Sequence, residues 1–133
     1  MTITIFDNII KITNNDNRYR GVGHMPREKF HTLTEPMFYI LLCLREECCG
    51  MDIMSKVDHM TGGRVNVGPG TLYNLLEQFL SAEMIYETKV VGRRRSYILS
   101  RKGKQMLADE YHRMEQVMAD YRSCMDNMVS EES

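Results

Sequence analysis

Three consecutive arginines, Arg93 to Arg95, stand directly after Gly92 and form a dense cationic group. The wider segment from Lys89 to Lys104 carries seven basic residues and no acidic residue. Clustered cations of this kind bind phosphate groups, and a glycine beside them favours a turn. The segment therefore predicts a basic turn that can contact the backbone of a nucleic acid.

A second polar group lies about twenty residues earlier, in the segment Gly68-Pro69-Gly70-Thr71-Leu72-Tyr73. Proline is favoured in the first turn of a helix, so we expect a helix, the recognition helix, to begin near Pro69. Helical spacing places its apolar residues on one side: Leu72, Leu75, Leu76, Phe79 and Leu80. The other side presents small, uncharged residues that can hydrogen-bond to base edges: Gly70, Thr71, Asn74, Gln78 and Ser81. Free amides at the helix N-terminus can bind a phosphate.

Each of these two features has an ordinary structural explanation. An amphipathic helix with a polar side is common, and an arginine-rich turn can serve solubility alone. Their order along the chain favours nucleic-acid binding, because the arginines follow a helix whose outer side suits base contacts. Together the two elements would span a DNA groove and the adjacent backbone.

The rest of the chain up to Ser100 predicts a hairpin and two further helices. Two β-favouring segments flank the turn at Gly92: Ile85–Val91 and Arg95–Leu99. Two helices are expected before the recognition helix: one from Thr34 to about Glu47, and one from Met51 to His59, stopped by Gly62-Gly63. We therefore expect a mainly α fold with a small β-hairpin, a winged helix-turn-helix with a long C-terminal dimerisation helix.

The last segment predicts a long helix from about Arg101 to Met128, capped by Ser100. Its apolar residues are spaced alternately by four and three positions: Leu107, Tyr111, Met114, Met118, Tyr121, Met125 and Met128. Such a heptad seam pairs with another helix, and a second copy of the chain would present two recognition helices to one duplex. The alternative is that the seam folds back onto the helix that begins at Thr34.

The seam also indicates where a small hydrophobic or aromatic molecule could bind. The chain holds 12 methionines, and many of them lie on this seam. Methionine side chains adapt to varied shapes, so they could line a ligand pocket or merely fill an irregular interface. A pocket would lie between the first and last helices, with four lining residues: Phe38, Leu42, Met114 and Met118.

Length and composition narrow the function classes. With 133 residues and a formal net charge of -1, the chain suits one domain and not a protein that coats nucleic acid indiscriminately. An enzyme is not favoured, since the four histidines are scattered and no nucleophile has a base beside it. The cysteines lack zinc-site spacing, although Cys48 and Cys49 could bind a soft metal or sense oxidants. We expect no metal, no cofactor and no membrane span, and a cytoplasmic location.

We divide the chain into three parts. Residues 1–29 form an N-terminal arm or extension, because a polar, turn-prone run sets them apart. In the competing interpretation, a short amphipathic helix from Phe6 to Ile12 packs on the domain or on a partner. Residues 30–100 form the winged helix-turn-helix DNA-binding domain, and residues 101–133 form the C-terminal dimerisation helix and tail.

Several short motifs, taken together, resemble those of the PadR-like transcriptional regulators between Leu33 and about Met128. In chain order the motifs are Leu33-Thr34-Glu35, Gly50-Met51-Asp52-Ile53, Gly68-Pro69-Gly70-Thr71-Leu72-Tyr73, Ala82-Glu83-Met84-Ile85, Gly92-Arg93-Arg94-Arg95-Ser96-Tyr97 and Leu99-Ser100-Arg101-Lys102-Gly103. The conjunction is specific, although no single motif is.

The resemblance implies a winged helix-turn-helix homodimer, usually a repressor, whose DNA affinity often falls when a small molecule binds. It assigns DNA contacts to seven residues: Gly70, Thr71, Tyr73, Asn74, Arg93, Arg94 and Arg95. Gly68 stands where relatives usually have serine, and Met51-Asp52 stands where Tyr-Glu is common, which leaves the sequence preference open. The chain has no tryptophan, so it cannot stack flat drugs on one as some relatives do.

The sequence thus predicts a sequence-specific, DNA-binding transcriptional regulator. We expect a homodimeric repressor that binds an operator in double-stranded DNA and is released by a small hydrophobic or aromatic effector. Gln78 joins the candidate DNA contacts because of its place on the outer side of the recognition helix. The alternative is a winged-helix module that binds proteins without touching DNA, for which an acidic or apolar outer side and no basic wing would be typical.

Overall fold

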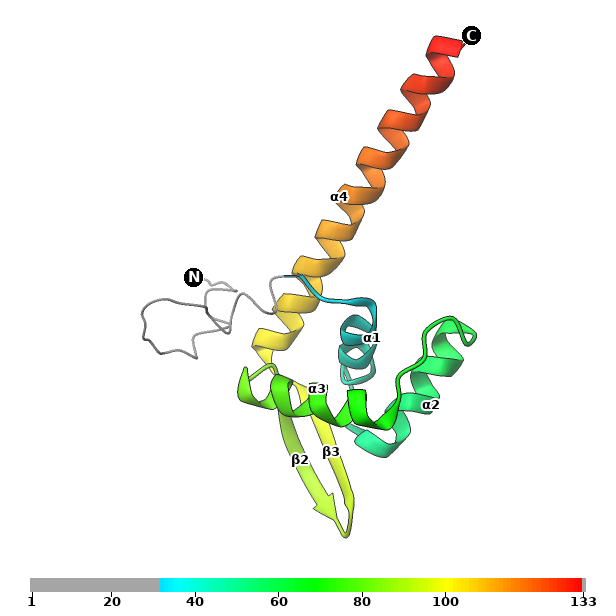
Figure 1. Cartoon of the computed structure of the whole chain (residues 1–133). Coiled ribbons are helices and arrows are strands. Elements are labelled where there is room, and N and C mark those ends of the chain that lie inside the picture. Colours follow the sequence, from blue (N-terminus) through cyan, green and yellow to red (C-terminus); the bar gives the residue numbers. More distant parts are fainter. Residues whose placement is uncertain (1–31, 133) are drawn as a thin grey trace.

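A computed structural model of the chain describes residues 32–132, so the expected arm and its alternative helix from Phe6 to Ile12 lie outside the described residues. The described part contains four α-helices and a three-stranded antiparallel sheet (Figure 1). In chain order these are α1 (Glu35–Cys43), β1 (Cys48–Cys49), α2 (Gly50–Thr61), α3 (Pro69–Ser81), β2 (Ile85–Val91), β3 (Arg94–Leu99) and α4 (Arg101–Glu132). The helices α1 to α3 pack together, the β2–β3 hairpin extends from them on one side, and α4 projects away on the other (Figure 1).

One apolar core joins the helices to the base of the hairpin. Ten large side chains in it are almost fully buried: Ile40, Leu41, Leu44, Ile53, Leu72, Leu76, Phe79, Met84, Ile85 and Met106. Burying a side chain of this size contributes about 1.5–3 kcal/mol. The apolar side of α3 is buried as its spacing predicts, and this burial fixes which residues of α3 face outward.

Local signals in the sequence place most helix ends. Thr34 caps α1, since its Oγ1 accepts a hydrogen bond from the Met37 backbone N–H at 3.4 Å. At the end of α2, Gly62 has a φ of 62°, a left-handed conformation that glycine adopts without strain. Pro69 is in the first turn of α3, as predicted. At the start of α4, the Ser100 Oγ accepts a hydrogen bond from a backbone N–H in the first turn at 3.0 Å.

The predicted end of α1 near Glu47 is wrong, because the helix ends at Cys43. The residues after it form the short strand β1, which pairs with β3. In addition, the Leu44 carbonyl accepts a hydrogen bond from the Leu99 backbone N–H at 2.8 Å. Pairing with β3 satisfies backbone groups that a longer helix would have used. The sheet therefore has three strands in the order β1-β3-β2, one more than the predicted hairpin.

Close backbone contacts join the start of α4 to the segment that leaves α3. Glu83, with a φ of 62°, turns the chain, and its carbonyl accepts a hydrogen bond from the Ser100 Oγ at 2.7 Å. The Met84 carbonyl accepts the Ser100 backbone N–H at 2.9 Å. A Cβ atom added to Gly103 would lie 2.1 Å from the Met84 carbonyl oxygen. Only glycine fits there, so this joint is tightly packed.

The helix α4 has two parts. We call residues 101–110, which pack on the domain, the base, and the mostly exposed residues 111–130 the shaft. At the base, Met106 and Glu110 are buried, and the Glu110 carboxylate accepts a hydrogen bond from the Leu33 backbone N–H at 3.3 Å. Glu110 also pairs with Arg113. Along the shaft every residue except Met114 is exposed to at least about a third of its full surface. The domain core therefore covers the base of α4 but not its shaft.

Candidate nucleic-acid interface

The outer side of α3 carries most of the residues predicted to read DNA. Four of them are exposed: Gly70, Thr71, Tyr73 and Asn74. Gln78 is only half-exposed, and Glu77 adds an exposed acid beside it. The first amides of a helix have no acceptor within the helix. Gly68, the N-cap residue, has no side-chain oxygen to bind them, so these amides can donate to a phosphate.

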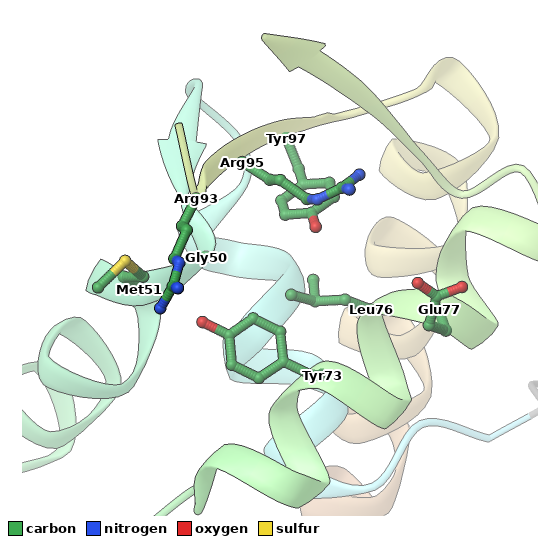
Figure 2. Close-up of a pocket in the computed structure, with 8 residues that line it drawn as sticks. All are labelled: Gly50, Met51, Tyr73, Leu76, Glu77, Arg93, Arg95 and Tyr97. Atoms are coloured by element: carbon green, nitrogen blue, oxygen red, sulfur yellow. The ribbon is translucent and has the colours of Figure 1, made fainter. Parts of the chain in front are cut away.

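A cavity of about 490 Å³ lies between α3, the start of α2 and the wing, which we define as β2, β3 and the turn between them (Figure 2). Its lining residues are Gly50, Met51, Tyr73, Leu76, Glu77, Arg93, Arg95 and Tyr97. Figure 2 shows Arg93 and the Tyr73 hydroxyl on the same side of the cavity, with Arg95 against Tyr97. The fold thus brings together three predicted DNA contacts from two elements.

Arg94 lies apart from its two neighbours. It lines a second cavity, of about 390 Å³, together with Glu47, Cys48, Cys49, Lys89, Val91 and Ser96. Successive side chains of a strand point to opposite faces, and Arg94 and Arg95 are successive residues of β3. The arginines therefore do not act as one cluster.

Folding also pairs two of these arginines with carboxylates. The Arg94 Nη2 atom lies 3.2 Å from the Oδ2 atom of Asp52 in α2. The Arg95 Nη1 atom lies 2.7 Å from the Oε2 atom of Glu87 in β2, and this hydrogen bond raises the pKa of Arg95 above its ordinary value. Within residues 32–132, Arg93 makes no ion pair. A phosphate can therefore reach Arg93 without displacing an acid of the described chain.

Three of the four cysteines, Cys43, Cys48 and Cys49, are buried, and Cys124 is exposed. Burial raises the pKa of the Cys43 thiol to about 11 and also raises the pKa of the Cys48 thiol. Thiols with raised pKa values stay protonated at neutral pH and react slowly. Among the residues that the structure describes, no group of three or more His, Cys, Asp or Glu side chains is placed to hold a metal ion.

The predicted dimer seam runs along the shaft of α4. Five of its residues are large exposed hydrophobics, with exposed fractions from 39% for Met125 to 66% for Tyr121: Tyr111, Met118, Tyr121, Met125 and Met128. The remaining two, Leu107 and Met114, are half-buried nearer the base. Of the predicted pocket residues, Phe38 and Leu42 are half-buried on α1, and none of the four lines either cavity described above.

A family model described as the transcriptional regulator PadR-like family matches residues 40–109, just over half of the chain. The chain belongs to the PadR-like family. The matched range runs from α1 to the base of α4, so it contains α3, the wing and both cavities. This PadR-like protein is a DNA-binding transcriptional regulator, as the motifs predict.

Solved structures of RosR from H. salinarum have the same winged-helix fold. The structure of RosR grown from NaBr matches with a TM-score of 0.56 and 22% identity, covering 75% of this chain and 93% of RosR. The complex structures named RosR-S1 and RosR-S4 match with TM-scores of 0.55 and 0.53, at 22% and 21% identity. Each match covers 75% of this chain. It covers 91% of the RosR chain in the RosR-S1 complex and 98% in the RosR-S4 complex. No curated protein sequence gives a significant match.

No helix in the described part of this PadR-like protein is both long and apolar enough to cross a membrane. The longest, α4, alternates apolar with charged and polar residues along its shaft. Its pattern is that of a helix with one apolar side.

Proposed function

We propose that this PadR-like protein is a cytoplasmic homodimeric repressor that binds a twofold operator in double-stranded DNA. The exposed apolar seam of α4 carries the proposal, since five of its seven residues stay exposed within residues 32–132. With 32 residues, α4 is about 48 Å long, and a seam of this length pairs readily with a second copy. Residues 30–100 then bind DNA and residues 101–133 dimerise.

In the proposed complex the two copies of α3 lie in successive major grooves, about 34 Å apart. The exposed Thr71 and Asn74 side chains face the base edges, while the first amides of α3 and Arg93 hold phosphates. Tyr73 lines the same cavity as Arg93, so it borders the same stretch of backbone. Gln78, being half-buried, makes the smallest contribution.

Selection of binding sites from random duplexes tests sequence-specific binding. Asn74→Ala should lose about 1–3 kcal/mol of binding free energy on the selected site and little on random DNA. Asn127→Ala, on the exposed shaft of α4, is the matched control and should bind as wild type does. Equal weakening of Asn74→Ala on all duplexes would remove its reading role. A wild type that binds no DNA at low salt would favour the protein-docking alternative.

Release by a small hydrophobic or aromatic effector is the second part of the proposal. Phe38 and Leu42 are half-buried on α1, beside the base of α4, and Met114 and Met118 follow on the shaft. In a dimer these four side chains would line an apolar pocket near the seam. Titration of hydrophobic compounds against operator binding tests this, with Phe38→Ala expected to weaken the effect of an active compound. A broad panel without effect contradicts release by a ligand.

A further inference from the structure

We propose that three carboxylates in and around the wing, Glu47, Asp52 and Glu87, weaken binding to all DNA. We call these residues the acidic collar. The inference rests on the DNA-binding function proposed above. It assigns a role in binding to acids that belong to neither the base-reading side of α3 nor the arginine turn.

Each collar residue faces one cation of the wing. The three pairs are Lys89–Glu47 at 4.0 Å, Arg94–Asp52 at 3.2 Å and Arg95–Glu87 at 2.7 Å. Glu47 is fixed further, because its Oε2 atom accepts a hydrogen bond from the Thr88 Oγ1 atom at 2.5 Å. The acids come from three different segments: the loop after α1, the helix α2 and the strand β2. Folding thus brings Glu47 and Asp52 to the wing, while Glu87 belongs to the wing itself.

The collar cancels most of the charge that the wing carries. Lys89 and the three arginines supply four positive charges, and the collar supplies three negative charges, so one positive charge remains. The side chains of the three pairs are 33–62% exposed. Exposed pairs add little to folding stability. The principal consequence of the collar is therefore the potential that an approaching duplex meets.

A phosphate that binds Arg94 or Arg95 competes with a carboxylate for the guanidinium group. Whether or not it stays paired, the carboxylate lies on the same surface, within the screening length of about 10 Å at 0.1 M salt, and repels the duplex. Non-specific binding depends almost wholly on such charges, so the collar weakens it directly. Operator binding loses the same charge interaction but keeps the base contacts of α3. The collar therefore keeps the protein from residing on random DNA.

The test measures binding of the full chain to a random-sequence duplex over a range of salt concentrations. Asp52→Asn and Glu87→Gln should each bind roughly two- to five-fold tighter at low salt, the effect expected of one exposed pair. The slope of log affinity against log salt should steepen by about one unit for each carboxylate removed. Asp120→Asn is the control, since it removes the same charge from the exposed shaft of α4 and should leave affinity unchanged.

Collar variants that bind like wild type overturn the proposal. Weaker binding also overturns it, because the carboxylates would then be positioning the arginines for DNA. If wild type binds no duplex at any salt concentration, the DNA-binding function itself fails, and the collar has nothing to restrain. Circular dichroism checks the fold of each variant. Should Asp52→Asn unfold, Glu87→Gln and Glu47→Gln give the same test from two other segments.

Discussion

In the wing, three of the four cations pair with a carboxylate, two of them with acids from outside the wing, whereas five of the seven residues of the apolar seam of α4 stay exposed in the described chain. Both regions carry a clear local pattern. Folding changes the charge pattern of the wing, because its partners belong to the same molecule. Folding leaves most of the seam exposed, and the dimer proposed above rests on this exposure.

The largest effect is expected from a charge placed in the seam. In the proposed dimer Met118→Glu occurs twice, and it removes two side chains that each contribute about 1.5–3 kcal/mol when buried. The dimer Kd should rise at least about 100-fold, which sedimentation velocity measures. The two added carboxylates also repel each other.

Gln116→Glu is the matched control for the seam, since it adds the same charge on the outward side of the same turn. Its dimer should be as tight as that of wild type. A monomeric wild type, or a Met118→Glu variant that dimerises normally, contradicts the dimer.

The next effect concerns the boundary between the base and the shaft of α4. Gly103→Ala should lower the free energy of unfolding by about 1–3 kcal/mol, because its Cβ would overlap the Met84 carbonyl. Gly70→Ala, also inside a helix, has no atom within 4 Å of the added Cβ and should raise stability by about 0.5–1 kcal/mol. Urea unfolding compares the two. Similar effects at both positions would mean that α4 is not anchored at this joint.

A smaller effect separates a free cation of the wing from a paired one. Arg93→Ala should weaken binding to any duplex by up to about five-fold and flatten the salt dependence by about one unit. The double variant Asp52→Asn/Arg94→Ala removes a cation together with its acid, so its affinity should stay within about two-fold of wild type. Fluorescence anisotropy at several salt concentrations measures both. If the two variants lose equal DNA affinity, the ion pair between an arginine and a carboxylate has no influence on binding.

The smallest effect is expected from a change of pH. Between pH 7 and pH 9 iodoacetamide should modify one thiol per folded chain, Cys124, which is exposed. A raised pKa means that a thiol stays protonated to higher pH, and the pKa of Cys43 is about 11. Mass spectrometry counts the adducts, and urea-unfolded protein should show four. More than one adduct on the folded chain at pH 9 would contradict the burial of the other three cysteines.

Much of the fold could be predicted because its signals are local. Thr34, Pro69 and Ser100 act through neighbouring backbone groups, and helical spacing alone determines which side of α3 is buried. β1 could not be predicted, since two residues carry no periodicity and their strand exists only through pairing with β3. The early end of α1 follows from the same distant contact.

The candidate site, too, has features that follow from local rules and contacts that do not. The exposure of Tyr73 and Asn74 follows from helical spacing, and the opposite orientations of Arg94 and Arg95 follow from the alternation of a strand. The partners of these arginines do not follow from any local rule. Asp52 is 42 residues before Arg94, so only the packing of α2 against the sheet brings them together.

The tight joint at Gly103 makes α4 a lever. The Met84 carbonyl that lies against Gly103 of α4 comes directly after the turn that ends α3. The two helices α3 and α4 therefore meet at one packed joint. A sideways force on the far end of α4, about 48 Å from the joint, produces a torque on it in proportion to that length. A molecule that binds the C-terminal end of α4 can therefore change the orientation of α3 without contacting α3.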